Sequence, residues 1–93
     1  MRLKDSELAA IKSTIENFDN SAEIYIFGSR VDNTKRGGDI DILIMSTMLT
    51  GGDKRAIKAK LYELLGEQKI DILIAADNSN PFVRLALGTG VKL

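Results

Sequence analysis

Three short apolar runs alternate along this chain with segments in which apolar residues recur at helical spacing. The runs are rich in β-branched and aromatic residues and are bounded by polar or glycine-containing stretches, which is typical of strands. They cover Glu23–Phe27, Asp39–Met45 and Lys69–Ala75. The connection from Ser29 to Gly38 is polar and predicts a loop, with room for one short helical turn.

Three helices are predicted around these strands. Asp5 or Ser6 can cap the first, Gly51-Gly52-Asp53 introduces the second, which ends near Leu65 before Gly66, and Asn80-Pro81 begins a short third helix. The expected inner stripes are Leu8, Ile11, Ile15 and Phe18 in the first helix, and Ile57, Leu61, Leu64 and Leu65 in the second. The order predicts an α/β (α+β) fold, with a small mixed sheet of about three strands and flanking helices.

Composition narrows the chemistry that such a fold can perform. The chain has 93 residues and is predicted to form a single domain over residues 1–93, with a formal net charge of zero that argues against nucleic-acid binding through a basic face. Cysteine and histidine are both absent, which excludes disulfides, thiol catalysis and most transition-metal sites. The metal chemistry that remains open to this chain is the binding of hard cations by oxygen ligands.

Neither a secretion signal nor a membrane span is expected. The N-terminal stretch MRLKDSEL is charged and lacks an apolar core, and no run approaches the roughly 20 apolar residues that cross a bilayer. We therefore expect a cytoplasmic protein without a membrane partner.

One internal repeat places two aspartates in equivalent positions of two predicted strands. The segment Ile40–Ile44 recurs letter for letter as Ile70–Ile74, with an aspartate at the same place in each, Asp41 and Asp71. Buried strands are built from few residue types, so the repeated apolar residues need no further explanation. The aspartate at the same place in each copy does need one. Because a helix joins the two strands, they are expected to be parallel neighbours, with Asp41 and Asp71 side by side.

The aspartates form the candidate catalytic and metal-binding set. Asp39 and Asp41 point to the same face of a strand, with Cα atoms roughly 6.5 Å apart, and Asp71 would add a third carboxylate. Three such carboxylates repel one another unless a cation lies among them, so the pattern predicts Mg²⁺ or Mn²⁺. The alternative is that these aspartates are solvated charges that only protect a strand edge from pairing. It does not explain why charged residues occur in a strand that is otherwise apolar.

A turn after the first strand is the candidate nucleotide-binding segment. Gly28 lets backbone N–H groups approach an anion, Ser29 adds a hydroxyl donor, and Arg30 is placed to contact phosphate. A plain turn remains the alternative for Gly28-Ser29, and a solvated loop for Lys35 and Arg36. Asp5 and Asp53 are expected at helix starts rather than at a metal.

These parts together resemble the minimal nucleotidyltransferases of the DNA polymerase β superfamily. The matching segments are Ile26-Phe27-Gly28-Ser29, a spacer of nine residues, Asp39-Ile40-Asp41-Ile42, and then Asp71. The resemblance covers essentially the whole chain. One departure is Gly38, where many members carry serine before the first aspartate.

The resemblance implies a role for each matched residue. Ser29 would hold the β- and γ-phosphates of a nucleoside triphosphate, ATP being the expected substrate, and Asp39 and Asp41 would bind Mg²⁺. Asp71 would help to bind the catalytic metal and would accept or steer the proton of the attacking hydroxyl. The implied reaction moves a nucleoside monophosphate onto an acceptor and releases pyrophosphate.

The small size narrows the class further by analogy. Free-standing minimal members are paired with a small helical protein of the HEPN type in toxin–antitoxin modules, where they resemble antitoxins that transfer AMP to the toxin. Two alternatives stay open: an idle binding module that only docks its partner, and a metal-dependent nucleotide hydrolase.

The C-terminal part of the chain carries many apolar residues for one short helix: Phe82, Val83, Leu85, Leu87, Val91 and Leu93. Either Phe82 and Leu85 cap the core and only the tail is exposed, or part of this segment mediates association with a partner or a second copy.

Overall fold

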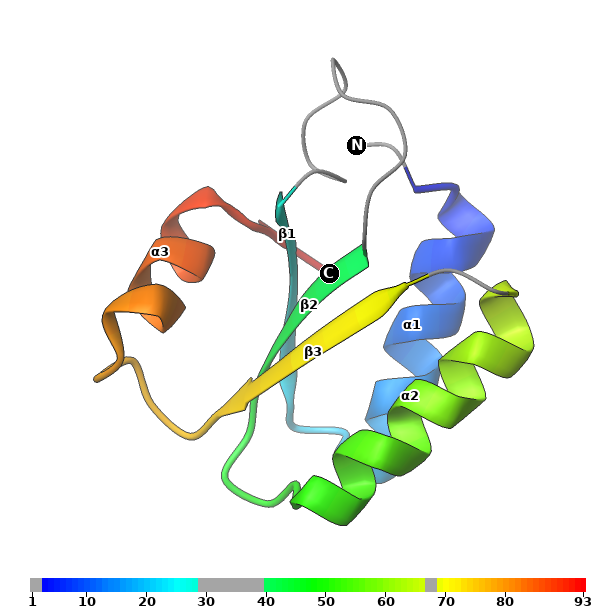
Figure 1. The fold of residues 1–93 in the computed structure, drawn as a ribbon, viewed down its shortest axis with the longest axis horizontal. Coiled ribbons are helices and arrows are strands. Elements are labelled where there is room, and N and C mark those ends of the chain that lie inside the picture. The colour runs from blue at the N-terminus through cyan, green and yellow to red at the C-terminus, as the bar shows by residue number, and fades with distance from the viewer. Residues whose placement is uncertain (1–2, 29–39, 67–68) are drawn as a thin grey trace.

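The computed structural model describes residues 3–28, 40–66 and 69–93 of the protein (Figure 1). Its elements are α1 (Asp5–Phe18), β1 (Glu23–Phe27), β2 (Ile40–Met45), α2 (Gly51–Leu65), β3 (Ile70–Ala75), α3 (Pro81–Thr89) and β4 (Val91–Lys92). The predicted α+β class is confirmed, and so are the three strands and three helices, with small shifts at their ends. The strand β4 was not predicted.

The sheet is mixed, with strand order β3-β2-β1-β4. Strand β1 is antiparallel to β2 and to β4, whereas β2 and β3 are parallel and joined by α2. The two copies of the repeated segment pair in register from Ile40 opposite Ile70 to Ile44 opposite Ile74. The prediction that these strands are parallel neighbours is therefore confirmed.

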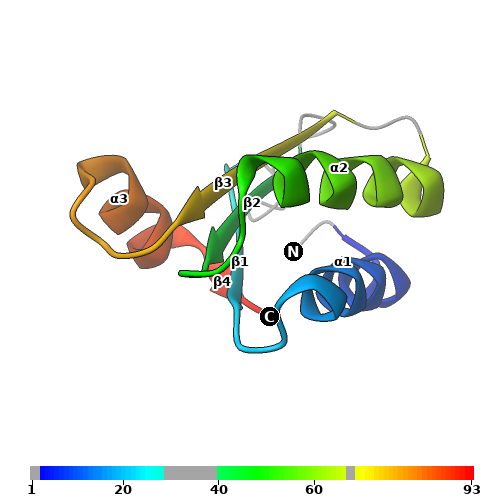
Figure 2. The same cartoon turned by 90° about the horizontal axis from the view of Figure 1, so that it is seen from below.

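Helices α1 and α2 lie side by side over one face of the sheet, and α3 lies over the other (Figures 1 and 2). Alternation along the strands divides the apolar side chains accordingly. The core under α1 and α2 includes Ile11, Ile15, Ile24, Ile26, Ile40, Ile42, Ile44, Ile57, Leu61 and Ile70, all buried. The smaller core under α3 is formed by Leu43, Val83 and Ala86. The α3 face is the less covered of the two, because one helix of nine residues packs on it.

The predicted inner stripes are correct except at two positions. Phe18 is 38% exposed, because it ends α1 and the following turn carries Asp19 into the interior instead. Leu64 is 49% exposed, because Ile57, Leu61 and Leu65 follow one another at a spacing of four and Leu64 lies off that line.

The helix starts follow the predictions for α2 and α3 but not for α1. Thr50 and Asp53 form a reciprocal cap, with the Asp53 backbone N–H donating to Thr50 Oγ1 at 3.2 Å. The Asn80 side chain accepts from Phe82 N–H at 2.8 Å, with Pro81 at the first helical position. At α1 the N-cap is Lys4, not Asp5 or Ser6, and the Glu7 carboxylate accepts from the Lys4 backbone N–H at 2.9 Å.

The C-terminal tail is fixed as an edge strand. Gly90 packs tightly, since a Cβ there would lie 2.7 Å from the Ala86 carbonyl oxygen and 3.0 Å from that of Ile26. Leu93 N–H donates to the Ile24 carbonyl at 2.9 Å, and Lys92 Nζ donates to Glu23 Oε2 at 2.9 Å. That hydrogen bond and the charge of Glu23 raise the pKa of Lys92 above its ordinary value.

The expectation that Phe82 and Leu85 cap the core is wrong. Val83 and Ala86 face the sheet and are almost fully buried, whereas Phe82 and Leu85 are 53% and 60% exposed. Among the described residues, no helix has the length and apolar character needed to cross a membrane.

A buried polar link, which the sequence did not reveal, joins two connections at one end of the sheet. Ser46 Oγ donates to Asp19 Oδ2 at 2.6 Å and accepts from the backbone N–H groups of Met48 and Leu49. Asp19 Oδ1 accepts from Ser21 N–H at 3.0 Å. The link ties the α1–β1 turn to the β2–α2 connection.

Replacing Ser46 with alanine is expected to destabilise the fold by about 1–3 kcal/mol, because the buried Asp19 carboxylate and two backbone N–H groups each lose a partner. Urea unfolding measures the loss. The matched control is Ser6→Ala on the exposed first turn of α1, which should change stability little. Equal stability of the two variants would show that the link is not stabilising.

Candidate functional site

Three strands have one of their ends at the same end of the sheet. Strand β1 ends there, and the parallel strands β2 and β3 begin there (Figure 1). Phe27, the last residue of β1, pairs with Asp41, and Asp41 in turn pairs with Asp71 across β2 and β3. The expected side-by-side placement of Asp41 and Asp71 is confirmed.

Both aspartates lie on the face of the sheet that α3 covers. Asp41 is two residues before Leu43, and Asp71 is two residues before Leu73; both leucines belong to the core under α3. In-register neighbours on adjacent strands have Cα atoms about 4.8 Å apart, so the two carboxylates can reach one ion. Asp41 is half-buried and Asp71 is exposed, which leaves the pair open to a ligand.

Gly28 is held directly against the carboxylate of Asp41. Its φ of +78° is in the left-handed region, which favours glycine, and a Cβ at this position would collide with Asp41 Oδ2 and lie 3.1 Å from Asp41 Cγ. The absence of a side chain at Gly28 therefore provides the space in which the Asp41 carboxylate sits. A turn without a side chain also lets an anion approach the backbone closely.

Several predicted site residues lie outside the described part of the chain. They are Ser29, Arg30, Lys35, Arg36 and Asp39. Their assignments remain predictions. Within the described ranges, no group of three or more aspartate, glutamate, histidine or cysteine side chains is arranged to hold a metal ion. The described part thus contributes two of the three predicted carboxylates, Asp41 and Asp71.

These two carboxylates fit a hard divalent cation by donor type and placement. Mg²⁺ and Mn²⁺ prefer carboxylate oxygens, and Mg²⁺ is commonly held by one or two carboxylates together with the phosphates of a substrate. The Asp41 carboxylate also lies close beside Gly28, where the predicted phosphate-binding turn begins. The residues present are therefore suitable for a metal-bound phosphate ligand.

An aromatic pair, which the sequence analysis did not predict, lies beside these acids. Phe27, opposite Asp41, packs against Phe82 of α3 with ring centroids 5.9 Å apart. Strand alternation could have placed Phe27 on the face of Asp41, but only the tertiary packing of α3 brings Phe82 there.

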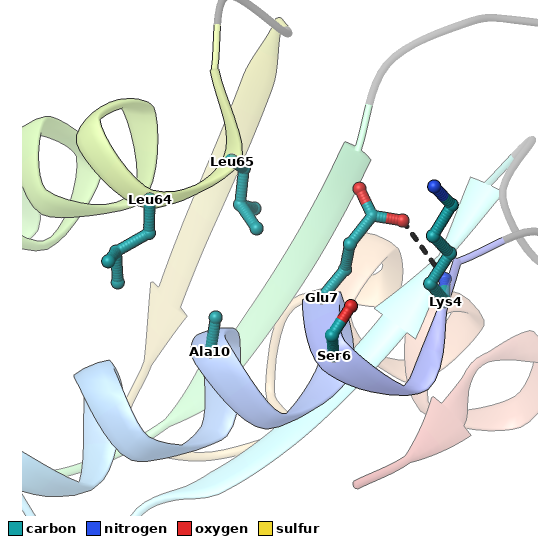
Figure 3. Close-up of a pocket in the computed structure, with 6 residues that line it drawn as sticks. All are labelled: Lys4, Ser6, Glu7, Ala10, Leu64 and Leu65. Carbon is teal, nitrogen blue, oxygen red and sulfur yellow. Dashed lines mark hydrogen bonds between the residues drawn. The ribbon is translucent and has the colours of Figure 1, made fainter.

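Two surface pockets lie away from the aspartates. One, of about 270 Å³, lies between the start of α1 and the end of α2, the helices on the opposite face (Figure 3). Its lining residues are Lys4, Ser6, Glu7, Ala10, Leu64 and Leu65. The other, of about 300 Å³, lies where α2 begins, near Leu73 and Ile74. Asp41 and Asp71 line neither of these two pockets.

A comparison with protein-family models agrees with this geometry. The family model described as polymerase beta, nucleotidyltransferase matches residues 9–93. The chain belongs to this nucleotidyltransferase family. A search of curated proteins finds no match to the chain.

Membership supports a nucleotidyltransferase-like function and a general transferase activity. Nucleotidyltransferase domains use a nucleoside triphosphate and a divalent metal, in agreement with the paired carboxylates beside a glycine turn.

Proposed function

We propose that the protein is a minimal nucleotidyltransferase that uses Mg²⁺ to transfer AMP from ATP onto a hydroxyl group of a partner protein. The proposed partner is a small helical protein of the HEPN type, the toxin of a cytoplasmic toxin–antitoxin pair. The observation that carries the proposal is the in-register pairing of Asp41 with Asp71, with Asp41 seated against Gly28.

Each residue has a defined part in this proposal. Asp41 and Asp71, together with Asp39, would hold Mg²⁺ or Mn²⁺. Gly28, Ser29 and Arg30 would hold the phosphates. A divalent cation, when bound, would neutralise charge that develops on the phosphate oxygens.

The reaction also requires that the acceptor hydroxyl is positioned and that its proton is removed. In the proposed reaction, the acceptor oxygen forms a bond to the α-phosphorus and the bond from that phosphorus to the bridging oxygen breaks, so pyrophosphate leaves. The acceptor proton passes to Asp71 or to solvent. The chain has no histidine, and Asp71 is exposed on the sheet face, where a docked hydroxyl can reach it. Docking would supply the positioning that a small domain lacks.

The second candidate is an idle binding module with the same fold. Phe82 and Leu85, both exposed and three residues apart on α3, favour a docking role, since neighbouring exposed apolar side chains form the kind of patch that marks an interaction surface. A pair of aspartates placed side by side weighs against idleness, because two like charges at this spacing have no structural benefit of their own.

Transfer should be visible when the protein is incubated with ATP, Mg²⁺ and the helical protein encoded beside it. The expected result is a partner whose intact mass has increased by one or more nucleoside monophosphates, with an equal amount of pyrophosphate released. The chain alone should turn over ATP slowly. An unmodified partner with orthophosphate as product would contradict transfer and favour hydrolysis, and no turnover would favour the idle module.

A further inference from the structure

Phe82 is an exposed aromatic residue on the same face of the sheet as the two aspartates. It is 53% exposed, whereas its neighbours Val83 and Ala86, which hold α3 on the sheet, are 1% and 2% exposed. The packing of α3 on the core therefore rests mainly on Val83 and Ala86. The ring of Phe82 is available to a ligand.

The position of this ring is fixed relative to the aspartates through one other side chain. Phe82 and Phe27 meet edge to face, with ring centroids 5.9 Å apart and an angle of 77° between the rings. Phe27 is directly opposite Asp41, and paired residues on antiparallel strands have Cα atoms about 4.5–5.5 Å apart. Phe27 is thus in contact with Phe82 and is also the cross-strand neighbour of Asp41.

We infer that Phe82 stacks on the base of the nucleoside triphosphate. The inference rests on the proposed function, which puts the phosphates at Asp41 and Asp71. Phosphates bound there tether the base close to this sheet face and so raise its local concentration near Phe82. The contact with Phe27 orients the ring without covering it.

Such a contact defines the ligand by class rather than by base identity. Every base has a π-face, so stacking strengthens binding without selecting among bases. Phe82 is therefore expected to raise the affinity for nucleoside triphosphates in general. It should contribute nothing to a ligand that has the phosphates and lacks the base.

Comparison of ATP with inorganic tripolyphosphate, both with Mg²⁺, isolates this contribution. The variant Phe82→Leu keeps an apolar side chain against Phe27 and removes the stacking surface. Its affinity for ATP should fall by roughly 5- to 150-fold, as for the loss of one base–aromatic stack, while its affinity for tripolyphosphate stays unchanged. Phe82→Tyr should restore ATP binding.

A fluorescence measurement provides a second readout. The chain has no tryptophan, so Phe82→Trp introduces a single tryptophan, which can be excited apart from the two tyrosines, at the proposed contact. ATP should quench this fluorescence and tripolyphosphate should not. The matched control is Tyr62→Trp on α2, on the opposite side of the sheet, where the parent ring is 39% exposed. Its fluorescence should not respond to ATP.

The outcomes separate this inference from the proposed function. If the parent binds ATP and transfers nucleotide but Phe82→Leu binds ATP equally well, only the stacking contact is overturned. Equal weakening of ATP and tripolyphosphate would also overturn it, because Phe82 would then act through the structure of the phosphate site. If the parent binds neither ligand, the proposed function fails and the inference fails with it.

Discussion

Nucleotide transfer is expected to fall by at least about 10³-fold when either Asp41 or Asp71 is replaced by asparagine. Asparagine keeps the size of the side chain and removes the negative charge that a divalent cation needs. In the proposed reaction both residues hold the metal, so a loss of about 4 kcal/mol of transition-state stabilisation from either change is expected. Initial rates of pyrophosphate release measure the effect.

The matched control is Asp77→Asn, an exposed aspartate beyond the other end of β3, whose carboxylate accepts from Ser79 N–H. It should retain the parent rate. Urea unfolding of Asp71→Asn should give nearly the parent stability, since Asp71 is exposed. Parent-like transfer by Asp41→Asn or Asp71→Asn would remove that residue from the metal site.

Gly28→Ala is expected to slow transfer strongly for a different reason. An alanine at φ +78° carries a backbone strain of about 1–2 kcal/mol, and its methyl group would occupy the place of Asp41 Oδ2. The carboxylate must move or the turn must open, and either change separates the Asp41 side chain from the phosphate turn. We expect a loss of about 10²-fold or more, as for a misplaced catalytic group.

Gly88→Ala is the control for this substitution. Gly88 lies inside α3 with no atom within 4 Å of a Cβ built there, so alanine should stabilise the helix by up to about 1 kcal/mol and leave transfer unchanged. Rates are compared at a temperature where unfolding curves show each variant to be folded. Parent-like activity of Gly28→Ala would mean that Asp41 does not need this contact.

The register of the central strands could be predicted because the sequence repeats itself. Identical apolar letters around Asp41 and Asp71, joined by a helix, are compatible with one parallel pairing that buries both strands, and that pairing is observed. Strand β1 was also predictable, since Glu23–Phe27 is apolar and bounded by polar residues. Local pattern was sufficient where at least one face of each strand is buried.

Features that depend on distant contacts were not predictable. Asp19 reads as a turn residue, and its burial depends on Ser46, 27 positions later. Strand β4 has only two residues, too few for alternation to show, and its position depends on close packing of Gly90 against Ile26. The contact of Phe82 with Phe27 likewise requires α3 to fold back over β1.

The candidate site also combines a feature that was predictable from the sequence with one that was not. The pairing of Asp41 with Asp71 followed from the repeat. The contact of Gly28 with the Asp41 carboxylate did not, because it depends on a positive φ and on the antiparallel pairing of Phe27 with Asp41.

Calorimetric titration of Mn²⁺–ATP into the parent protein and into Asp39→Asn, Asp41→Asn and Asp71→Asn tests the central claim most directly. The three aspartates are proposed to form one metal–nucleotide site, so each variant should bind Mn²⁺–ATP more weakly than the parent. Asp77→Asn should bind with the affinity of the parent. Unchanged affinity in Asp41→Asn and Asp71→Asn would contradict the assignment of the paired aspartates as the metal–nucleotide site.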